Sequence, residues 1–220
     1  MARLARVILP GYPHHIIQRG NRRQDVFFCD DDYISYLGLL KEWCHNEGIE
    51  IWAYCLMTNH VHLILKPDQD SNLLKAIAET HRRYTRMINF RQNWRGYLWQ
   101  GRFSSYPMEQ AYLLKATAYV ELNPVKAKMV KSAWDYRWSS VHAHIKDTDP
   151  HGIVDSQNLL EICGDWKSYL MQSQPILDKT LESHLNTGRP LGNDNFIRMA
   201  EQLLGRDLRK NKPGPKSKDK

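Results

Sequence analysis

Residues 49–66 read IEIWAYCLMTNHVHLILK, and this stretch decides the fold. Two apolar runs, Ile49–Met57 and His60–Lys66, are separated only by the dipeptide Thr58-Asn59. A two-residue connection between apolar runs is typical of a tight β-hairpin. The hairpin therefore predicts two antiparallel neighbours in a sheet, and the rest of the chain is placed around it.

The sequence on both sides of the hairpin predicts a mixed α+β domain. Its predicted elements are, in order, strand His14–Arg19, helix Asp30–Asn46, the two hairpin strands, helix Asn72–Asn89, strand Phe103–Pro107 and a helix from about Glu109 to Asn123. Pro124 prevents continuation of the last helix. This order suggests a ferredoxin-like antiparallel sheet with helices packed on one face.

The chain of 220 residues is long enough for one globular domain with an appendage. We expect a main domain over residues 1–149, a helical annex over 150–205 whose role its pattern does not reveal, and a basic disordered tail over 206–220. Four scattered cysteines with no CxxC pair suggest neither a disulfide framework nor a cysteine zinc site.

Neither a membrane span nor a secretory signal is predicted. No apolar run approaches the roughly 20 residues that a bilayer span needs, and the charged N-terminus lacks the apolar stretch of a signal peptide. We therefore expect a cytoplasmic protein with no membrane partner.

The net charge of +7 is unevenly distributed. The first 24 residues hold five arginines and no acid, and residues 81–102 hold six more arginines, again without an acid. The second stretch also carries five aromatic residues, Tyr84, Phe90, Trp94, Tyr97 and Trp99. Basic groups follow a phosphate backbone and flat rings stack on unpaired bases, so the mixture indicates single-stranded nucleic acid. The alternative is a solvated helix face with its aromatic residues in the core.

His60 and His62 are two residues apart on a predicted strand, so both imidazoles face the same side of the sheet. Two imidazoles side by side on a rigid element can hold one metal ion, although surface or core histidines are the alternative. A second copy of the pattern, His142-Ala143-His144, stands in what looks like a surface segment, and we assign it no function.

The last predicted helix carries a possible nucleophile. Tyr112, Ala116, Tyr119 and Asn123 follow spacings of four, three and four residues, so they share one helix face. Tyr119 and Asn123 could lie over the open face of the sheet beside the histidines. Alternatively, Tyr119 is a core aromatic and Asn123 only precedes a proline at a helix end.

These residue types suit the cleavage of a phosphodiester. A metal ion neutralises charge that develops on phosphate oxygens, and a tyrosine phenolate can attack phosphorus and later leave. Two imidazoles and an amide oxygen form a mixed nitrogen and oxygen site that is compatible with Mn²⁺ or Mg²⁺.

The chain resembles the REP-associated tyrosine transposases of the HUH superfamily of single-stranded DNA nucleases. The resemblance rests on ordered segments: Tyr12–Asn21 (YPHHIIQRGN), Tyr54–Leu63 (YCLMTNHVHL), Gln100–Phe103 (QGRF), Tyr119–Val125 (YVELNPV) and Trp138–Ser140 (WSS). It implies a ferredoxin-like domain that recognises a DNA hairpin with a short guide sequence and cuts one strand beside it.

The resemblance also implies roles for individual residues. His60 and His62 match the paired metal ligands, Tyr119 the nucleophile and Asn123 the third ligand. Glu121 is a rival third ligand, although two residues along a helix turn it roughly 160° away from Tyr119. The expected DNA-binding residues are Arg19, Asn21, Arg22, Arg23, Arg82, Arg83, Arg86, Tyr97 and Arg102.

We therefore expect a Mg²⁺- or Mn²⁺-dependent single-stranded DNA strand transferase that forms a 5′-phosphotyrosine and acts as a monomer or a homodimer. A noncatalytic hairpin-binding protein of the same fold and a metal hydrolase that activates water are the alternatives.

Overall fold

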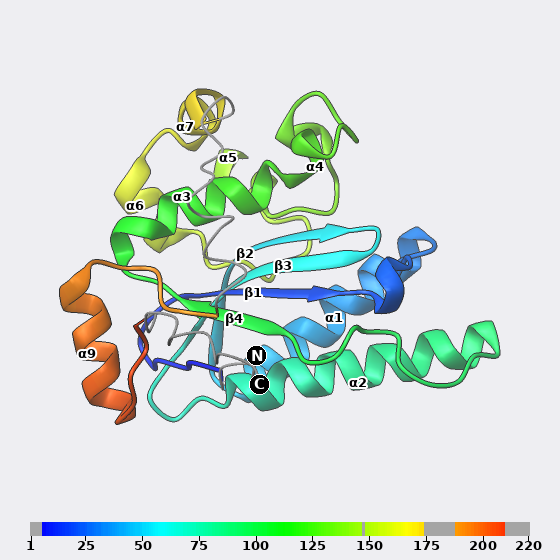
Figure 1. Ribbon diagram of the computed structural model, residues 1–220. Coiled ribbons are helices and arrows are strands. Elements are labelled where there is room, and N and C mark those ends of the chain that lie inside the picture. The colour runs from blue at the N-terminus through cyan, green and yellow to red at the C-terminus, as the bar shows by residue number, and fades with distance from the viewer. Residues whose placement is uncertain (1–5, 147, 174–187, 210–220) are drawn as a thin grey trace, which may run out of the picture.

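The computed structural model describes residues 6–146, 148–173 and 188–209, which build a four-stranded antiparallel sheet (Figure 1). The strands are β1 (His14–Arg19), β2 (Ile49–Met57), β3 (His60–Pro67) and β4 (Ser104–Pro107). Their order in the sheet is β2-β3-β1-β4, and Thr58-Asn59 joins β2 directly to β3. The predicted hairpin is confirmed, and β1 lies between β3 and β4.

Two long helices, α1 (Asp30–Asn46) and α2 (Leu73–Gln92), cover one face of the sheet, below it in Figure 1. Three aspartates open α1, where negative charge is favourable near the helix N-terminus. The Asn72 side chain accepts a hydrogen bond from the Lys75 amide and so caps α2. Helix α2 runs three residues beyond the predicted Asn89, and Asn93 ends it in the left-handed conformation.

A third long helix, α3 (Gln110–Glu121), lies on the opposite face, above the sheet in Figure 1. The expectation of helices on one face holds for α1 and α2 but is wrong for α3. Leu113, Ala116 and Val120 of this helix are fully buried or nearly so. These apolar side chains need a surface to cover, and the second face of the sheet supplies it.

Pro124 does more than end a helix. Helix α3 stops at Glu121, and Pro124 stands in the first turn of a new short helix, α4 (Asn123–Lys126). Proline is tolerated there because the first amide groups of a helix have no partner within the helix. Asn123 consequently lies at the junction of two helices, and its side chain is held near Tyr119.

Residues 157–173, which lie in the stretch predicted as an annex, pack on the sheet. After the 3₁₀ turn η2 (Ala133–Asp135), the chain forms α5 (Val141–Lys146), α6 (Gln157–Cys163) and α7 (Trp166–Ser173). Leu159, Trp166 and Leu170 are buried in the same core as the sheet. The basic tail that the sequence predicts lies outside the described residues from position 210 onward.

Helix α9 (Asp194–Leu204) packs instead against the N-terminal segment. Phe196 and Ala200 on α9 form a smaller cluster with Val7 and Leu9. Among the described helices, none is long and apolar enough to cross a membrane.

Candidate active site between the sheet and helix α3

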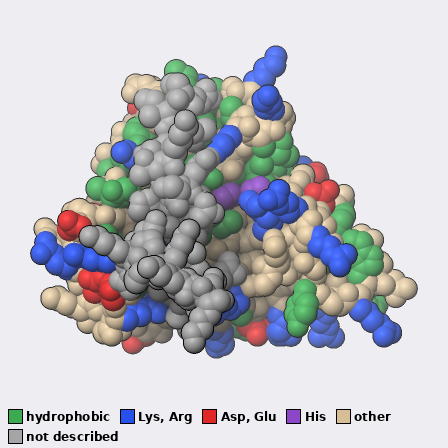
Figure 2. All heavy atoms as spheres, in the orientation of Figure 1, with side chains coloured by type: hydrophobic (Ala, Val, Ile, Leu, Met, Phe, Trp, Pro, Cys, Tyr) green, Lys and Arg blue, Asp and Glu red, His purple; other side chains and the backbone are tan. Residues whose placement is uncertain are grey.

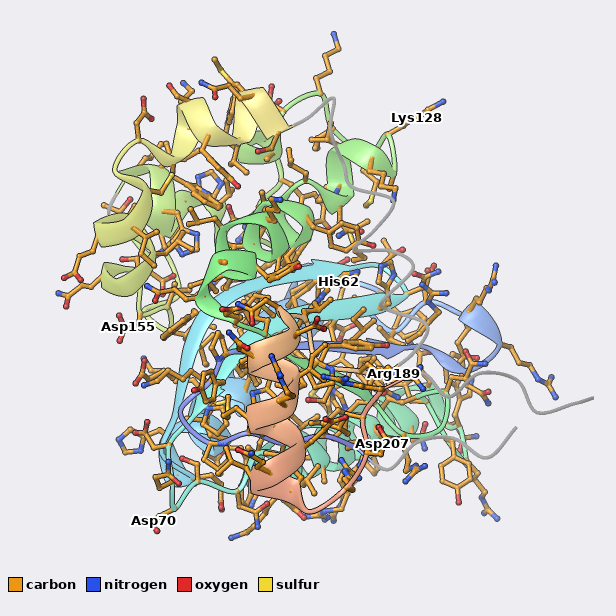
Figure 3. All side chains as sticks on the ribbon, turned by 60° about the vertical axis from the view of Figure 1, so that its left-hand side comes forward. His62, Asp70, Lys128, Asp155, Arg189 and Asp207 are labelled. Atoms are coloured by element: carbon orange, nitrogen blue, oxygen red, sulfur yellow. The ribbon has the colours of Figure 1, made fainter. Side chains whose placement is uncertain are left out.

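His60 and His62 lie at the start of β3 on the same side of the sheet, as their two-residue spacing predicts, and this side carries α3. Their ring centroids are 5.0 Å apart. His62 is only 3% exposed and lies between the sheet and α3 (Figure 3), whereas His60 is half-buried. The Nδ1 atom of His60 donates to Asn59 Oδ1 over 2.6 Å. This bond leaves Nε2 of His60 to face other partners.

A third histidine, His15 on β1, joins this pair, and the sequence reasoning missed it. His15 Nε2 lies 2.9 Å from His62 Nδ1, and both rings are buried. The register pairs Ile17 with His62 across β1 and β3, so His15, two residues from Ile17, faces the same side. The alternation of residues 14–19 shows which side chains of this strand share a face with His15. Placing His15 beside His62 also requires the pairing of β1 with β3, two strands that are distant in sequence.

Burial keeps the three histidines neutral, which is the form that can accept a hydrogen bond or ligate a metal ion. Removal from water lowers the pKa of His15 to about 3 and the pKa of His60 to about 4. The pKa of His62 is also held well below 6.5 by burial, with a smaller contribution from the neighbouring histidines and Arg19. Neutral imidazoles at neutral pH carry the free lone pair that a metal ligand needs.

Tyr119 of α3 lies over the histidines. Its ring centroid is 5.8 Å from that of His62 and 6.0 Å from that of His15. Burial raises the pKa of Tyr119, and the positive charge of Arg19 opposes that rise. The Lys126 Nζ atom lies 5.4 Å from the centre of the Tyr119 ring, a cation that sequence reasoning did not single out. Two cations therefore accompany the phenol.

Asn123 is held beside Tyr119 by the backbone of α3. Its side chain is buried, and Nδ2 donates to the Tyr119 carbonyl oxygen over 2.7 Å. This bond uses the donor end of the amide, and Oδ1 is the end that could ligate a cation. Among the described residues, no group of three or more His, Cys, Asp or Glu side chains could hold a metal ion. A metal site here would need oxygen from an amide, from water or from phosphate.

Glu121, the rival ligand, points away from the histidines into a buried polar cluster. Its Oε1 atom accepts hydrogen bonds from Ser140 Oγ (2.5 Å) and His144 Nδ1 (2.7 Å). Its Oε2 atom accepts from Trp166 Nε1 over 2.7 Å. His144 Nε2 lies 3.0 Å from the Trp52 carbonyl oxygen. The expectation that the second histidine pair lies at the surface is wrong for His144, which this cluster buries.

Two of the stretches expected to bind DNA lie side by side next to the histidines. Arg19 of β1 is paired with His60 of β3 in the register of the sheet. The Gln100 backbone amide donates a hydrogen bond to the Arg19 carbonyl oxygen. The Asn21 amide donates to Leu98, which places the turn η1 (Asn21–Arg23) beside the 97–102 loop. Figure 2 shows histidine side chains at the surface next to Lys and Arg side chains.

Gly20 allows the chain to fold back closely on itself in this turn. A Cβ at Gly20 would lie 2.2 Å from the Gln24 carbonyl oxygen and 2.9 Å from a Val26 methyl group. Only glycine fits this close approach. Arg22 and Arg23 follow in left-handed conformations, with φ of 53° and 63°, and both are exposed. The turn therefore presents two guanidinium groups to solvent.

The arginines of α2 are placed differently. Arg82 pairs with Glu79, and Arg83 pairs with Glu42 and lies over the Trp43 ring. Because α2 covers the other face of the sheet, the structure does not bring Arg82, Arg83 or the exposed Arg86 together with the histidines.

The aromatic residues of this region separate into two groups. Tyr84 and Trp99 are core residues, 0% and 7% exposed, as the packing alternative proposed. Phe90 and Tyr97 are 91% and 87% exposed, and Trp94 is 43% exposed. The exposed rings have the accessibility that base stacking requires.

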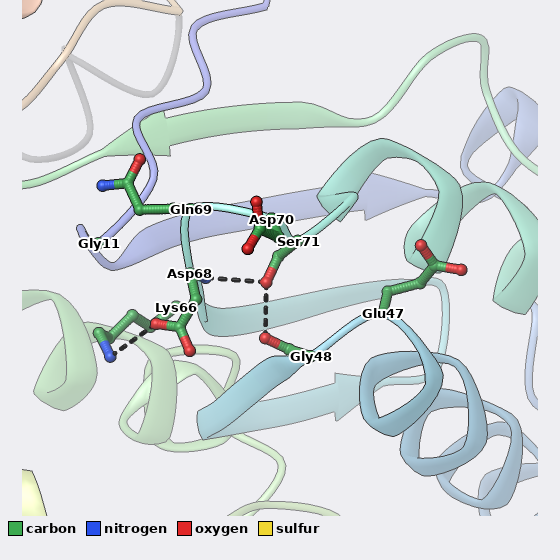
Figure 4. A pocket seen from close by; sticks show the side chains of 8 residues that line it. All are labelled: Gly11, Glu47, Gly48, Lys66, Asp68, Gln69, Asp70 and Ser71. Carbon is green, nitrogen blue, oxygen red and sulfur yellow. Dashed lines mark hydrogen bonds and ion pairs between the residues drawn. The ribbon is translucent and has the colours of Figure 1, made fainter.

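A pocket of about 660 Å³ lies near the far end of β3, six residues from His60 along the strand (Figure 4). Glu47, Lys66, Asp68 and Asp70 are among its lining residues, and Lys66 pairs with Asp68. The pocket is separate from the histidine site.

Comparisons with known proteins identify the family of the chain. Residues 10–123 match the family model described as Transposase IS200 like, so the chain belongs to the IS200-like transposase family. This match spans the strands, the histidine pair and the tyrosine helix. The chain is a DNA transposase by family, and the resemblance noted from its sequence segments is confirmed.

A protein of Haemophilus influenzae described as a REP-associated tyrosine transposase is 29% identical over 127 residues, which are 52% of this chain and 72% of that protein. A solved structure of a REP-associated tyrosine transposase bound to a REP hairpin matches the fold with a TM-score of 0.59. The match has 20% sequence identity and covers 71% of this chain and 94% of the other.

Proposed function

We propose that this transposase cuts and rejoins single-stranded DNA beside a hairpin, with Tyr119 as the nucleophile and a divalent metal ion held by His60, His62 and Asn123. The observation that carries the proposal is one cluster of rings, in which the Tyr119 ring centroid lies 5.8 Å from that of His62 and the His62 ring centroid lies 5.0 Å from that of His60. A phenol, imidazole lone pairs and flanking cations are the groups that phosphodiester transfer requires.

The donor set fits Mg²⁺ or Mn²⁺. His60 directs Nδ1 at Asn59, which leaves Nε2 as its ligating atom, and Asn123 can offer Oδ1. Two nitrogens and one oxygen leave positions for water and for a phosphate oxygen, as Mg²⁺ and Mn²⁺ sites commonly have. When bound, the metal would neutralise negative charge on the phosphate.

Tyr119 supplies the transfer chemistry. Its Oη atom forms a bond to phosphorus, the bond from phosphorus to O3′ breaks, and the phenol proton ends on that O3′. The products are a 5′-phosphotyrosine and a free 3′-hydroxyl group. Attack by a 3′-hydroxyl group reverses the step, because phenolate is a better leaving group than an alkoxide. Burial alone disfavours the phenolate, the charge of Arg19 favours it, and Lys126 lies against the face of the same ring.

The surface beside the histidines suits a single strand that leaves a hairpin. Arg22 and Arg23 can contact phosphates, and the exposed Tyr97 ring can stack on an unpaired base. The structural relative is bound to a REP hairpin, and we propose the same class of ligand for this chain. The contacts of Arg82 and Arg83 with Glu79 and Glu42 favour a lesser role for α2 in DNA binding.

A cleavage assay tests the proposal. Purified protein is incubated with a panel of hairpin oligonucleotides labelled 3′ of the hairpin foot, with Mn²⁺ or with EDTA. The expected result is a denaturant-resistant adduct that carries the label with Mn²⁺ and is absent with EDTA or in His62→Ala. Hairpin binding without cleavage under any divalent metal would favour a noncatalytic binder. Nicking without an adduct would favour a hydrolase.

A further inference from the structure

His15 occupies a position that the metal-binding proposal leaves unexplained. Its side chain is 0% exposed, and its Nε2 atom faces His62 Nδ1 at 2.9 Å. Its other ring nitrogen, Nδ1, is buried and has no hydrogen-bond partner among the described residues. A buried imidazole nitrogen without a hydrogen-bond partner costs stability. The contact with His62 is therefore the feature that can account for a histidine at this position.

His60 provides the comparison. Its Nδ1 donates to Asn59 Oδ1, which places its proton on Nδ1 and its lone pair on Nε2. Nδ1 of His62 faces Nε2 of His15. Of the two ring nitrogens of His15, only Nε2 has a hydrogen-bond partner among the described residues. Each of the two proposed ligands therefore has a hydrogen-bonding atom beside its Nδ1 atom, which is Asn59 Oδ1 for His60 and His15 Nε2 for His62.

The tautomer of His62 follows from this geometry. Because Nδ1 of His62 is covered by His15, Nε2 is the atom left for a cation. Nε2 has a free lone pair only when the proton of the neutral ring is on Nδ1. That proton then points at His15 Nε2, which must accept it, and His15 keeps its own proton on Nδ1.

We propose that His15 is a positioning residue that accepts the His62 Nδ1–H hydrogen bond and thereby orients His62 Nε2 toward the metal ion. This inference rests on the proposed metal site. It assigns His15 no ligand role, in agreement with the lack of a three-histidine metal geometry in the described residues. A hydrogen bond to the second nitrogen of a ligating histidine commonly fixes its orientation and raises its affinity for the metal.

The position of His15 suits this role. It lies on β1, which is hydrogen-bonded to β3 on one side and to β4 on the other. The Tyr106 and Tyr119 rings lie 6.3 Å and 6.0 Å from the His15 ring. A side chain on a central strand with aromatic neighbours on its face is a rigid support for the ligand.

The first measurement uses the wild-type protein without metal. Long-range ¹⁵N–¹H NMR of the imidazole rings reports which nitrogen of His62 carries the proton. The proposal predicts a proton on Nδ1 of His62 and on Nδ1 of His15. A proton on His62 Nε2 would overturn it, whatever any variant does.

The second measurement is the Mn²⁺ dissociation constant, by electron paramagnetic resonance, of wild type, His15→Phe and His15→Gln in the presence of a hairpin oligonucleotide. Loss of the acceptor in His15→Phe should weaken Mn²⁺ binding about 10- to 100-fold. Gln offers an oxygen acceptor and should restore affinity to within a few-fold. His81→Phe is the matched control, because His81 is also buried, 8% exposed, but is hydrogen-bonded to Tyr36 on the other face of the sheet.

The outcomes separate the two proposals. Unchanged Mn²⁺ affinity in His15→Phe, with wild-type affinity measurable, overturns the role of His15 and leaves the proposed function standing. Absence of Mn²⁺ binding in wild type, where the oligonucleotide binds, overturns the metal site itself. Hairpin binding in EDTA and the thermal unfolding midpoint establish that each variant is folded.

Discussion

Replacement of Glu121 by leucine should destabilise the protein without removing a metal ligand. The carboxylate is 0% exposed and accepts hydrogen bonds from Ser140, His144 and Trp166. Leucine leaves the His144 and Trp166 donors buried and unpaired. Each unpaired donor costs about 1–3 kcal/mol, so the two together cost about 2–6 kcal/mol. We expect a loss of about 2–6 kcal/mol in the free energy of unfolding.

Urea unfolding followed by tryptophan fluorescence measures this loss by linear extrapolation. The double variant Glu121→Leu/His144→Leu should lose less than the sum of the single variants, by about 1–3 kcal/mol, because the two side chains satisfy each other. A loss below about 1 kcal/mol in Glu121→Leu, or additive single changes, would refute the cluster.

The same position distinguishes the two possible third ligands. Glu121→Gln should leave the Mn²⁺ dissociation constant unchanged, because the carboxylate faces His144 and Trp166. Asn123→Ala should weaken Mn²⁺ binding. A tenfold loss in Glu121→Gln with none in Asn123→Ala would make Glu121 the ligand.

Three further predictions concern DNA binding and pH. Tyr97→Ala should weaken binding of single-stranded DNA by about 1–3 kcal/mol in a fluorescence anisotropy titration, since one stacked base is lost; an unchanged affinity would exclude stacking there. Arg22→Gln should reduce the slope of log affinity against log salt by about one, whereas Arg82→Gln, which loses only the pair with Glu79, should not. Equal slopes for the two variants would contradict the placement of the DNA on the histidine side. Burial holds the pKa of His14 at about 4 and the pKa of His81 at about 3 in the folded chain, against 6.5 for a histidine in water. Below pH 6.5 the unfolded chain therefore binds more protons than the folded chain. The free energy of unfolding decreases as the pH is lowered, until the folded pKa values are reached. Between pH 7.5 and 5.5 each histidine should cost about 1.4 kcal/mol in urea unfolding; a flat profile would contradict their burial.

Two features could be predicted because they depend on local sequence alone: the hairpin, and the side of the sheet on which the histidine pair lies. Alternation sets the side to which His60 and His62 point, and Thr58-Asn59 permits only a tight connection. Helix spacing likewise brought Tyr119 and Asn123 together. Such features need no knowledge of distant contacts.

The remaining features depend on contacts between distant segments. His15 meets His62 only because β1 pairs with β3, over a separation of 47 residues. Glu121 meets Trp166 over 45 residues, so neither the cluster nor the burial of His144 could be read from spacing. Tyr84 and Tyr97 look alike in the sequence, yet tertiary packing buries one and exposes the other.

The most direct test of the proposed mechanism compares two tyrosines of α3. Tyr119→Phe and Tyr112→Phe each remove one hydroxyl group from the same helix, and Tyr112 is half-buried. Each variant is incubated with the cleavable hairpin oligonucleotide and Mn²⁺, and covalent adducts are located by mass spectrometry. We predict that Tyr112→Phe forms the adduct at Tyr119 and that Tyr119→Phe forms none. A covalent adduct in Tyr119→Phe would contradict the mechanism.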